Sequence, residues 1–172
     1  MIIHLIRHGE AIERSQEIIE EHRFLTCRGR KRFRKVASSL KKTGVKPDLI
    51  LTSPLVRAVQ TAEILAQALK QRGDLLVSTL LAPGFQPGEL DELLSRYPKA
   101  REIALVGHEP DLGALAGNLM AAPAGCALQK GAAISFKLAT GHQGEAEFLQ
   151  LIGPDGKIIT SRKKALKRLL RG

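Results

Sequence analysis

Met1-Ile2-Ile3-His4-Leu5-Ile6-Arg7-His8-Gly9-Glu10 is the stretch that decides the fold of this chain. Ile2 to Ile6 is a short apolar run rich in β-branched residues, and Gly9 closes it, so the run predicts a buried strand that leads directly into a loop. Arg7 and His8 open that loop. Ligands of open α/β sheets bind outside the carboxyl ends of the strands, so we expect this loop to be functional.

Strands and helices alternate along the rest of the chain. Apolar positions at Phe33, Val36, Ala37 and Leu40 have the spacing of an amphipathic helix, within an expected helix at 29–42. The other expected helices are 55–69, 89–96 and 110–122, and the expected strands are 48–51, 75–80 and 102–106. A hairpin of 132–138 and 145–152, connected through 140–144, is expected to follow. This order predicts a three-layer α/β/α sandwich with a mostly parallel sheet and an antiparallel edge.

The charge is concentrated in two segments. The chain has 172 residues and a net charge of +10, a length that predicts one domain over 1–160 followed by a basic helix or tail over 161–172. Residues 22–47 hold ten Lys and Arg and no acid, and residues 156–172 hold seven and no acid. The remaining residues carry ten basic and 17 acidic side chains. Nucleic acid is therefore not an expected partner.

The two cysteines, Cys27 and Cys126, lie 99 positions apart without a CxxC partner. This spacing predicts neither a zinc site nor a disulfide framework and favours the cytoplasm. No targeting segment is expected after Met1, and the uncharged stretch 112–129 is interpreted as a buried helix that ends before Pro123, not as a membrane span. We expect a monomer without metal or cofactor.

Two arginines and two histidines follow the expected strands. Arg7 and His8 follow the first strand, Arg57 lies one turn into the helix after the second, and His108 follows the fourth. Guanidinium groups bind phosphoryl oxygens bidentately, and a neutral imidazole attacks phosphorus. We therefore expect His8 to be the nucleophile and Gly9 to let the backbone approach the anion, with Arg7, Arg57 and His108 holding the phosphoryl group. A purely structural role for either histidine is the alternative.

The motifs together resemble the histidine phosphatase superfamily, which has the phosphoglycerate mutase-like fold. Arg7-His8-Gly9 matches its RHG loop, Leu25-Thr26 with Gly29 matches LTxxG, residues 53–62 match SPLxRAxQTA, and Gly107-His108 matches the end of the second-histidine strand. The resemblance extends over about residues 1–119. It implies that His8 is phosphorylated and that Arg7, Arg57 and His108 form the phosphate pocket.

Gly107-His108-Glu109-Pro110-Asp111-Leu112 and the short loops are most similar to SixA-type phosphohistidine phosphatases. Members of the superfamily that cleave phosphoesters usually carry a proton-donating Glu after the third strand, whereas 81–88 contains no acid and Glu89 is the nearest substitute. An imidazole leaving group protonates near neutral pH and needs less acid catalysis than an alkoxide. The resemblance therefore implies a cytoplasmic, metal-independent phosphatase for a phosphorylated signalling protein, such as a histidine phosphotransfer domain.

Two other functions are alternatives. One is a phosphatase for small phosphoesters with Glu89 or Asp91 as the acid, and the other is a non-catalytic phosphate-binding module with basic docking segments. The basic segments are either solvated surfaces or attract acidic partners. Glu10 either orients a pocket side chain or is a solvated carboxylate. We interpret His4 as a packed strand residue, Ser53 as a helix cap and Thr61 as a helix surface position.

Overall fold

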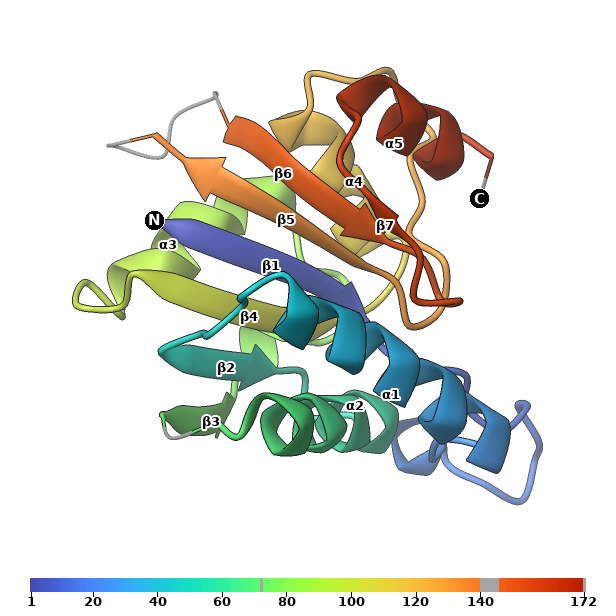
Figure 1. Cartoon of the computed structure of the whole chain (residues 1–172). Helices are drawn as coiled ribbons and strands as arrows, with labels where there is room; N and C mark the ends of the chain where they lie inside the picture. The colour runs from blue at the N-terminus through green and yellow to red at the C-terminus, as the bar shows by residue number, and fades with distance from the viewer. Residues whose placement is uncertain (72, 140–145, 172) are drawn as a thin grey trace.

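A mixed sheet forms the middle layer of the structure. The computed structural model describes residues 1–71, 73–139 and 146–171. Its strands are β1 (Ile2–Arg7), β2 (Leu49–Thr52), β3 (Asp74–Val77), β4 (Glu102–Gly107), β5 (Ala133–Leu138), β6 (Ala146–Ile152) and β7 (Ile158–Ile159). Within the described residues they form a 7-stranded sheet in the order β3-β2-β4-β1-β5-β6-β7 (Figure 1). The first four run parallel, and the pairs β1–β5, β5–β6 and β6–β7 are antiparallel.

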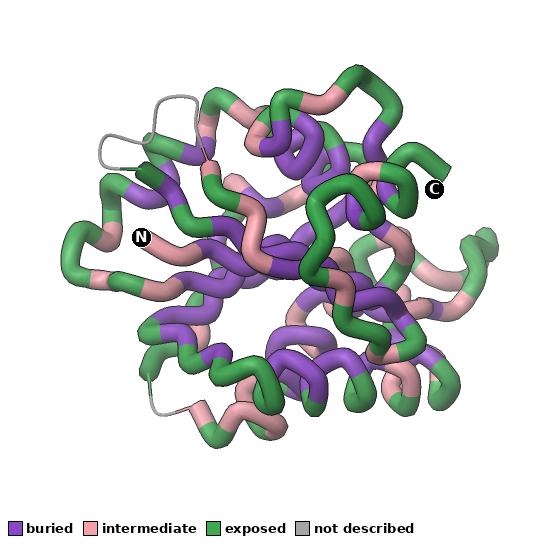
Figure 2. Tube along the Cα trace, turned by 45° about the horizontal axis from the view of Figure 1, so that its top comes forward, coloured by how far each residue is buried: buried purple, intermediate pink, exposed green. Residues whose placement is uncertain are grey.

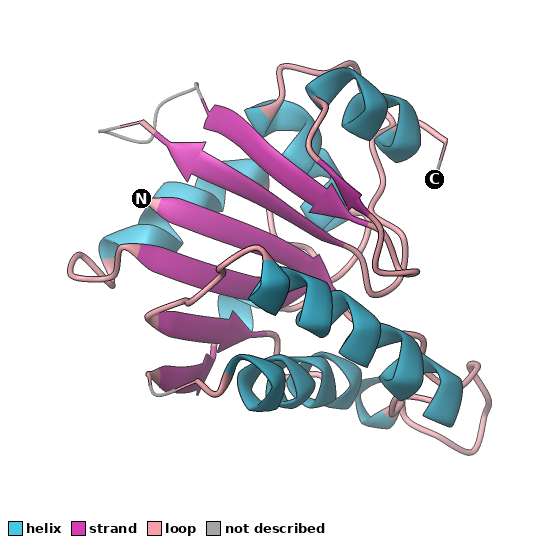
Figure 3. Cartoon of the chain, viewed as in Figure 1, coloured by secondary structure: helices cyan, strands magenta, loops and turns pink. Residues whose placement is uncertain are grey.

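Helices cover both faces of the sheet (Figure 3). One face carries α1 (Cys27–Lys42) and α2 (Val56–Leu69), and the other carries α3 (Leu90–Ser95), α4 (Asp111–Leu119) and α5 (Arg162–Leu169). Side chains alternate along each strand, so Ile6 packs against the α1 and α2 side while Ile3 and Leu5 pack into the opposite core. Figure 2 shows the buried strands between the two helical layers. The predicted fold class is confirmed.

Local sequence signals explain where α1 begins and what it buries. Thr26 is its N-cap, and the Thr26 side chain accepts a hydrogen bond from the Gly29 N–H at 2.8 Å, so the helix starts two residues before the predicted one. Its buried face includes the predicted apolar positions. His4 is confirmed as a packed strand residue, because it is 2% exposed and its ring nitrogens lie 2.7 Å from Ser135 Oγ and 3.0 Å from Glu102 Oε1.

Several predicted elements differ from the structure. β3 ends at Val77, and a short 3-10 helix, η2 (Thr79–Leu81), follows it. α4 ends at Leu119, well before Pro123, since Ala121 has a φ of +42° that leaves the helical path. The two-residue strand β7 was not predicted, because it is too short to show an alternating pattern. The expected hairpin connection at 140–144 lies outside the described residues.

The C-terminal basic segment folds as a helix against the sheet. In α5, Ala165 and Leu169 are buried in the core that also contains α3 and α4, whereas Leu170 is 46% exposed. The domain boundary at residue 160 stays a prediction. In the described part of the chain, every helix is too short or too polar to cross a membrane.

Candidate active site

The structure brings the two predicted histidines together. His8 directly follows β1 and His108 directly follows β4, and these neighbouring parallel strands pair Arg7 with Gly107 in register. The two imidazole rings have centroids 5.1 Å apart. They line a cavity of about 600 Å³, here called the active cavity, together with Arg7, Arg57 and other residues discussed below.

His8 is held as a neutral imidazole with one defined tautomer. Its Nδ1 lies 2.7 Å from the Gly9 carbonyl oxygen, which only accepts, so Nδ1 carries the proton. Nε2 therefore carries no proton, and its lone pair accepts a hydrogen bond from Arg57 Nε at 3.2 Å. Burial, assisted by nearby cationic groups, lowers the pKa of His8 to about 3. The nitrogen that faces Arg57 is thus available as a nucleophile at neutral pH.

Arg57 lies in the first turn of α2, and its guanidinium group is held by a segment that sequence reasoning missed. Its Nη1 donates to the Glu20 carbonyl oxygen at 2.8 Å, and its Nη2 lies 3.0 Å from Glu20 Oε1. Glu20 begins a 3-10 helix, η1 (Glu20–His22), and its carboxylate also contacts Arg14 and Arg23 at 3.0 and 2.9 Å. Burial would raise the pKa of Glu20, but the arginine hydrogen bonds and charges lower it overall. Glu20 is therefore an anion inside the active cavity.

Arg7 is anchored by the backbone that precedes β5. Its Nη1 donates to the Leu128 carbonyl oxygen at 2.6 Å, and Glu109 Oε1 accepts the Leu128 N–H at 3.1 Å. Burial raises the pKa of Glu109 to about 7, although the Leu128 N–H and the Arg7 charge oppose the rise. Burial also lowers the pKa of the Arg7 guanidinium. Glu109 lines the active cavity, and its position next to His108 in the motif was the only sequence signal for it.

His108 is positioned by Ser53 at the end of β2. Its Nε2 lies 2.7 Å from Ser53 Oγ, and that oxygen accepts the Leu55 N–H at 3.3 Å. The Ser53 hydroxyl proton is then free to donate to Nε2, which favours the tautomer with the other proton on Nδ1. Burial lowers the pKa of His108 to about 4. Ser53 thus supports the histidine, and the N-cap of α2 is Leu55, not Ser53 as predicted.

Two buried nitrogens of this site lack a hydrogen bond. Among the described residues, Arg7 Nε and His108 Nδ1 are buried without a partner. A buried unsatisfied donor costs about 1–3 kcal/mol, so such groups need an explanation. Both residues line the active cavity, where the oxygens of a bound oxyanion would accept from them.

Thr61 fixes the His8 loop to α2. The Gly9 N–H donates to Thr61 Oγ1 at 3.0 Å, and the Thr61 hydroxyl donates to the Arg57 carbonyl oxygen at 2.7 Å. Thr61 is completely buried. Its interpretation as a helix surface position was therefore wrong, because its side of α2 packs against the loop that carries the nucleophile.

Glu10 points away from the active cavity. Its carboxylate lies 3.5 Å from Arg28 Nε and 3.7 Å from Arg32 Nη1 of α1. Its carbonyl oxygen accepts the Thr26 N–H at 3.0 Å, and a Cβ on Gly29 would overlap that same oxygen. The LTxxG segment therefore allows α1 to pack directly against the backbone of the His8 loop.

The predicted candidate acids do not line the active cavity. Glu89 ends a 3-10 helix, η3 (Pro87–Glu89), and its Oε2 accepts the Gln86 N–H at 2.6 Å in a capping box. Asp91 is exposed in α3. The carboxylates that line the active cavity are instead Glu13, Glu20 and Glu109. Within the described residues, no three His, Cys, Asp or Glu side chains are grouped so that they could hold a metal ion.

The family model of the histidine phosphatase superfamily (branch 1) matches residues 3–78, which carry the His8 loop, the segment around Gly29 and Arg57. An uncharacterised protein of Picosynechococcus sp. is 41% identical over 115 residues, a match that covers 66% of this chain and 69% of that protein. The chain belongs to the histidine phosphatase superfamily.

Solved structures place this histidine phosphatase among the SixA-type members. The structure of the protein histidine phosphatase SixA complexed with tungstate matches with a TM-score of 0.78 and 25% identity over 90% of this chain and 97% of that one. The α-ribazole phosphatase from Shigella flexneri has a TM-score of 0.68 at 19% identity over 94% of this chain and 97% of the other, which shows the shared fold alone.

Proposed function

We propose that this phosphatase hydrolyses phosphohistidine in a phosphorylated signalling protein, such as a histidine phosphotransfer domain, through a phosphohistidine intermediate on His8. The observation that carries the proposal is the neutral His8 ring, whose Nδ1 proton is held by the Gly9 carbonyl while Nε2 faces Arg57. Arg7 and His108 line the same cavity and supply donors for the phosphoryl oxygens.

Two displacements at phosphorus make up the reaction. In the first, the His8 Nε2 lone pair forms a bond to phosphorus while the P–N bond to the substrate imidazole breaks, and the departing nitrogen takes a proton from solvent. In the second, water attacks phosphorus and releases a proton to solvent, the bond to His8 Nε2 breaks with its electron pair returning to the nitrogen, and inorganic phosphate leaves with the water oxygen. Arg7, Arg57 and His108 would stabilise the charge on the equatorial oxygens in both steps, and no metal ion is invoked.

The placement of the predicted acid supports a P–N substrate. Glu89 is engaged in its capping box, away from the residues that line the active cavity. An imidazole leaving group protonates near neutral pH, so its departure does not depend on a dedicated acid. The likeness to the protein histidine phosphatase SixA agrees with this choice of substrate.

A substrate panel tests the proposal. We expect rapid turnover of a protein phosphorylated on histidine and slow turnover of sugar phosphates. A brief reaction quenched without acid should leave an acid-labile phosphoryl group on the enzyme, and the His8→Ala variant should lose both the labelled intermediate and turnover. Normal turnover by His8→Ala would refute the role of His8, and equal rates on sugar phosphates would refute the preference for phosphohistidine.

A phosphatase for small phosphoesters is the second candidate, and Glu109 is the observation that favours it. Burial raises the pKa of this cavity carboxyl to about 7, so a fraction of it holds a proton at neutral pH. A carboxylic acid of that kind is suited to protonate an alkoxide leaving group. If phosphoesters are the substrates, Glu109→Gln should lower their turnover about a hundredfold, whereas Glu89→Gln and Asp91→Asn should leave it unchanged.

A further inference from the structure

A second cavity lies on the other side of the His8 loop. It has a volume of about 570 Å³, and we call it the basic cavity because its walls include Arg32 of α1, Lys130 and Arg168 of α5. Arg7 and Lys130 line both the basic cavity and the active cavity, so the two spaces adjoin along these side chains. A ligand held in one is next to the other.

Glycines keep the basic cavity open. Gly9, Gly29 and Gly131 all line it. Gly131 has a φ of +77°, and a Cβ there would lie 3.7 Å from the Phe33 ring and 3.8 Å from the Gly9 Cα. Any larger residue would therefore be strained and would also fill the space between α1 and the His8 loop. The cavity therefore results from the same close packing of backbone segments that positions His8.

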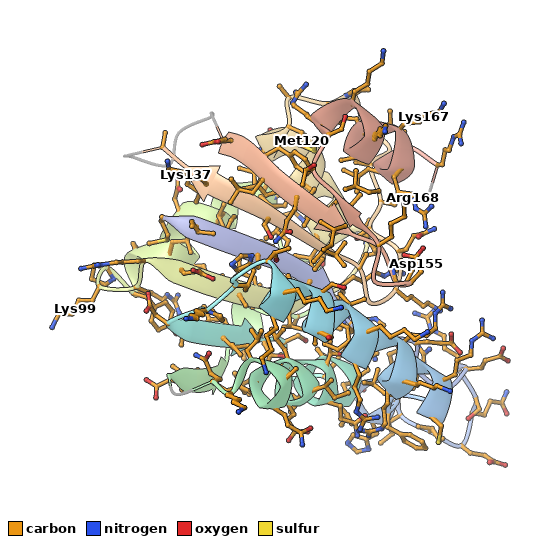
Figure 4. The ribbon with its side chains drawn as sticks, in the orientation of Figure 1. Lys99, Met120, Lys137, Asp155, Lys167 and Arg168 are labelled. Carbon is orange, nitrogen blue, oxygen red and sulfur yellow. The ribbon has the colours of Figure 1, made fainter. Side chains whose placement is uncertain are left out.

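The cationic groups of the basic cavity come from both basic segments of the sequence. Arg32 belongs to the first segment and its side chain is 41% exposed, with Nη1 3.7 Å from Glu10 Oε2. Arg168 belongs to the second segment, and its Nη2 donates to Gln129 Oε1 at 2.9 Å. Figure 4 shows Arg168 and Asp155 at the same end of the molecule, with Lys99 at the opposite end. Two segments far apart in sequence thus meet beside the active cavity.

We propose that the basic cavity binds acidic side chains of the phosphorylated protein substrate while its phosphohistidine occupies the active cavity. The inference rests on the proposed function and adds a determinant of substrate choice. The guanidinium groups of arginine bind carboxylates through paired hydrogen bonds. Glu10 and Asp155 also line the cavity and partly offset its positive charge, and the positive charge that remains favours acidic side chains.

Two phosphohistidine peptides that differ only in flanking residues provide the test. One carries Glu on both sides of the phosphohistidine and the other carries Gln at the same positions. We expect kcat/KM of the wild-type protein to favour the Glu peptide about fivefold at low ionic strength, since exposed ion pairs are individually weak, and to lose the preference as salt is added. The double variant Arg32→Glu/Arg168→Glu should reduce the ratio to about one or below.

Matched variants separate this cavity from general surface charge. Lys167→Glu changes the neighbouring residue on α5, which does not line the basic cavity, and Lys99→Glu changes a lysine at the far end of the molecule. Both should keep the preference for the Glu peptide. Arg32→Ala/Arg168→Ala provides a neutral version of the double variant that retains the fold if the charge reversal does not. All variants should hydrolyse phosphoramidate, which has no flanking residues, at the wild-type rate.

Each outcome has a distinct meaning. Equal kcat/KM of the wild-type protein on the two peptides, or an unchanged preference in the double variants, would overturn the role of the basic cavity while leaving the proposed function intact. An equal loss of preference in Lys167→Glu would overturn it as well. Failure of the wild-type protein to hydrolyse phosphoramidate and both peptides would overturn the proposed function and this inference with it.

Discussion

Arg57 Nη2 lies 3.0 Å from Glu20 Oε1, so the guanidinium group to which we assign phosphoryl binding is already paired with a carboxylate. The other two nitrogens of Arg57 also donate one hydrogen bond each, Nη1 to the Glu20 carbonyl oxygen and Nε to His8 Nε2. An oxyanion entering the active cavity must therefore compete with the Glu20 carboxylate and is repelled by it.

Glu20→Gln is expected to tighten the binding of tungstate and inorganic phosphate about five- to tenfold, because a like charge near the anion is removed while an acceptor for Arg57 remains. Inhibition constants measured by competition with substrate would report this. Glu17→Gln removes an exposed carboxylate of the same segment and should leave the constants unchanged. Weaker inhibition of Glu20→Gln would show instead that the charge of Glu20 is needed to position Arg57.

Thr61→Val should weaken both stability and catalysis. The substitution keeps the shape but leaves the buried Gly9 N–H without its acceptor at 3.0 Å and removes the hydroxyl that donates to the Arg57 carbonyl. We expect the free energy of unfolding to fall by about 1–3 kcal/mol, measured with urea, together with a lower kcat. Thr61→Ser keeps the hydroxyl and should retain most of kcat. Equal losses of kcat in the two variants would contradict the anchoring role.

The sequence was sufficient to predict which side chains meet at the sheet edge. His8 and His108 both follow strands, and parallel strands bring their carboxyl ends to one edge wherever the strand order makes them neighbours. Arg57 was placed by the same reasoning, because it lies in the first turn of the helix that follows β2. These predictions needed only the order of elements along the chain and local spacing, whereas the neighbouring positions of β1 and β4 in the sheet come from the structure.

Residues whose roles depend on tertiary packing were missed or misplaced. Glu20 reaches Arg57 from a segment without strand or helix periodicity, so no local pattern indicated the contact. The pKa of Glu109 is raised by burial of its carboxyl group, which no sequence spacing predicts. Thr61 did leave a signal, since it follows Arg57 by one helical turn and must share its face of α2. This spacing predicts a buried position for Thr61 more reliably than its polar side chain predicts a surface position.

Gly29→Ala should destabilise the protein despite lying inside a helix. Helix propensity alone would favour Ala over Gly by about 1 kcal/mol. However, the new Cβ would overlap the Glu10 carbonyl oxygen, which is backbone and is fixed by the Thr26 N–H. We expect a loss of about 3 kcal/mol or more, measured by urea denaturation. Gly88→Ala meets no atom within 4 Å and should change stability by less than about 0.5 kcal/mol. If the Gly29→Ala variant were more stable than the wild-type protein, the His8 loop must shift to accommodate the new Cβ.

Acid should destabilise the protein through its active-site histidines. Burial lowers the pKa of His8 to about 3 and of His108 to about 4 from an ordinary 6.5. Between the folded-state pKa values and 6.5, the unfolded chain binds protons that the folded protein does not. The free energy of unfolding therefore keeps its full value above pH 6.5 and decreases as the pH falls toward 4. Glu109 acts in the opposite sense, because its pKa is raised from 4.5 to about 7 and its contribution to stability is lost as the pH rises from 4.5 to 7.

Comparison of matched variants isolates the histidine contribution, since Glu109 is present in each of them. Between pH 6.5 and 4.5 the wild-type protein should lose about 1 kcal/mol more per pH unit than His8→Asn or His108→Asn, measured from urea unfolding at each pH. His22→Asn replaces an exposed histidine and should follow the wild-type dependence. Parallel curves for the wild-type protein and His8→Asn would mean that His8 is protonated in the folded state over this range, which would remove the basis for treating its Nε2 as a free lone pair.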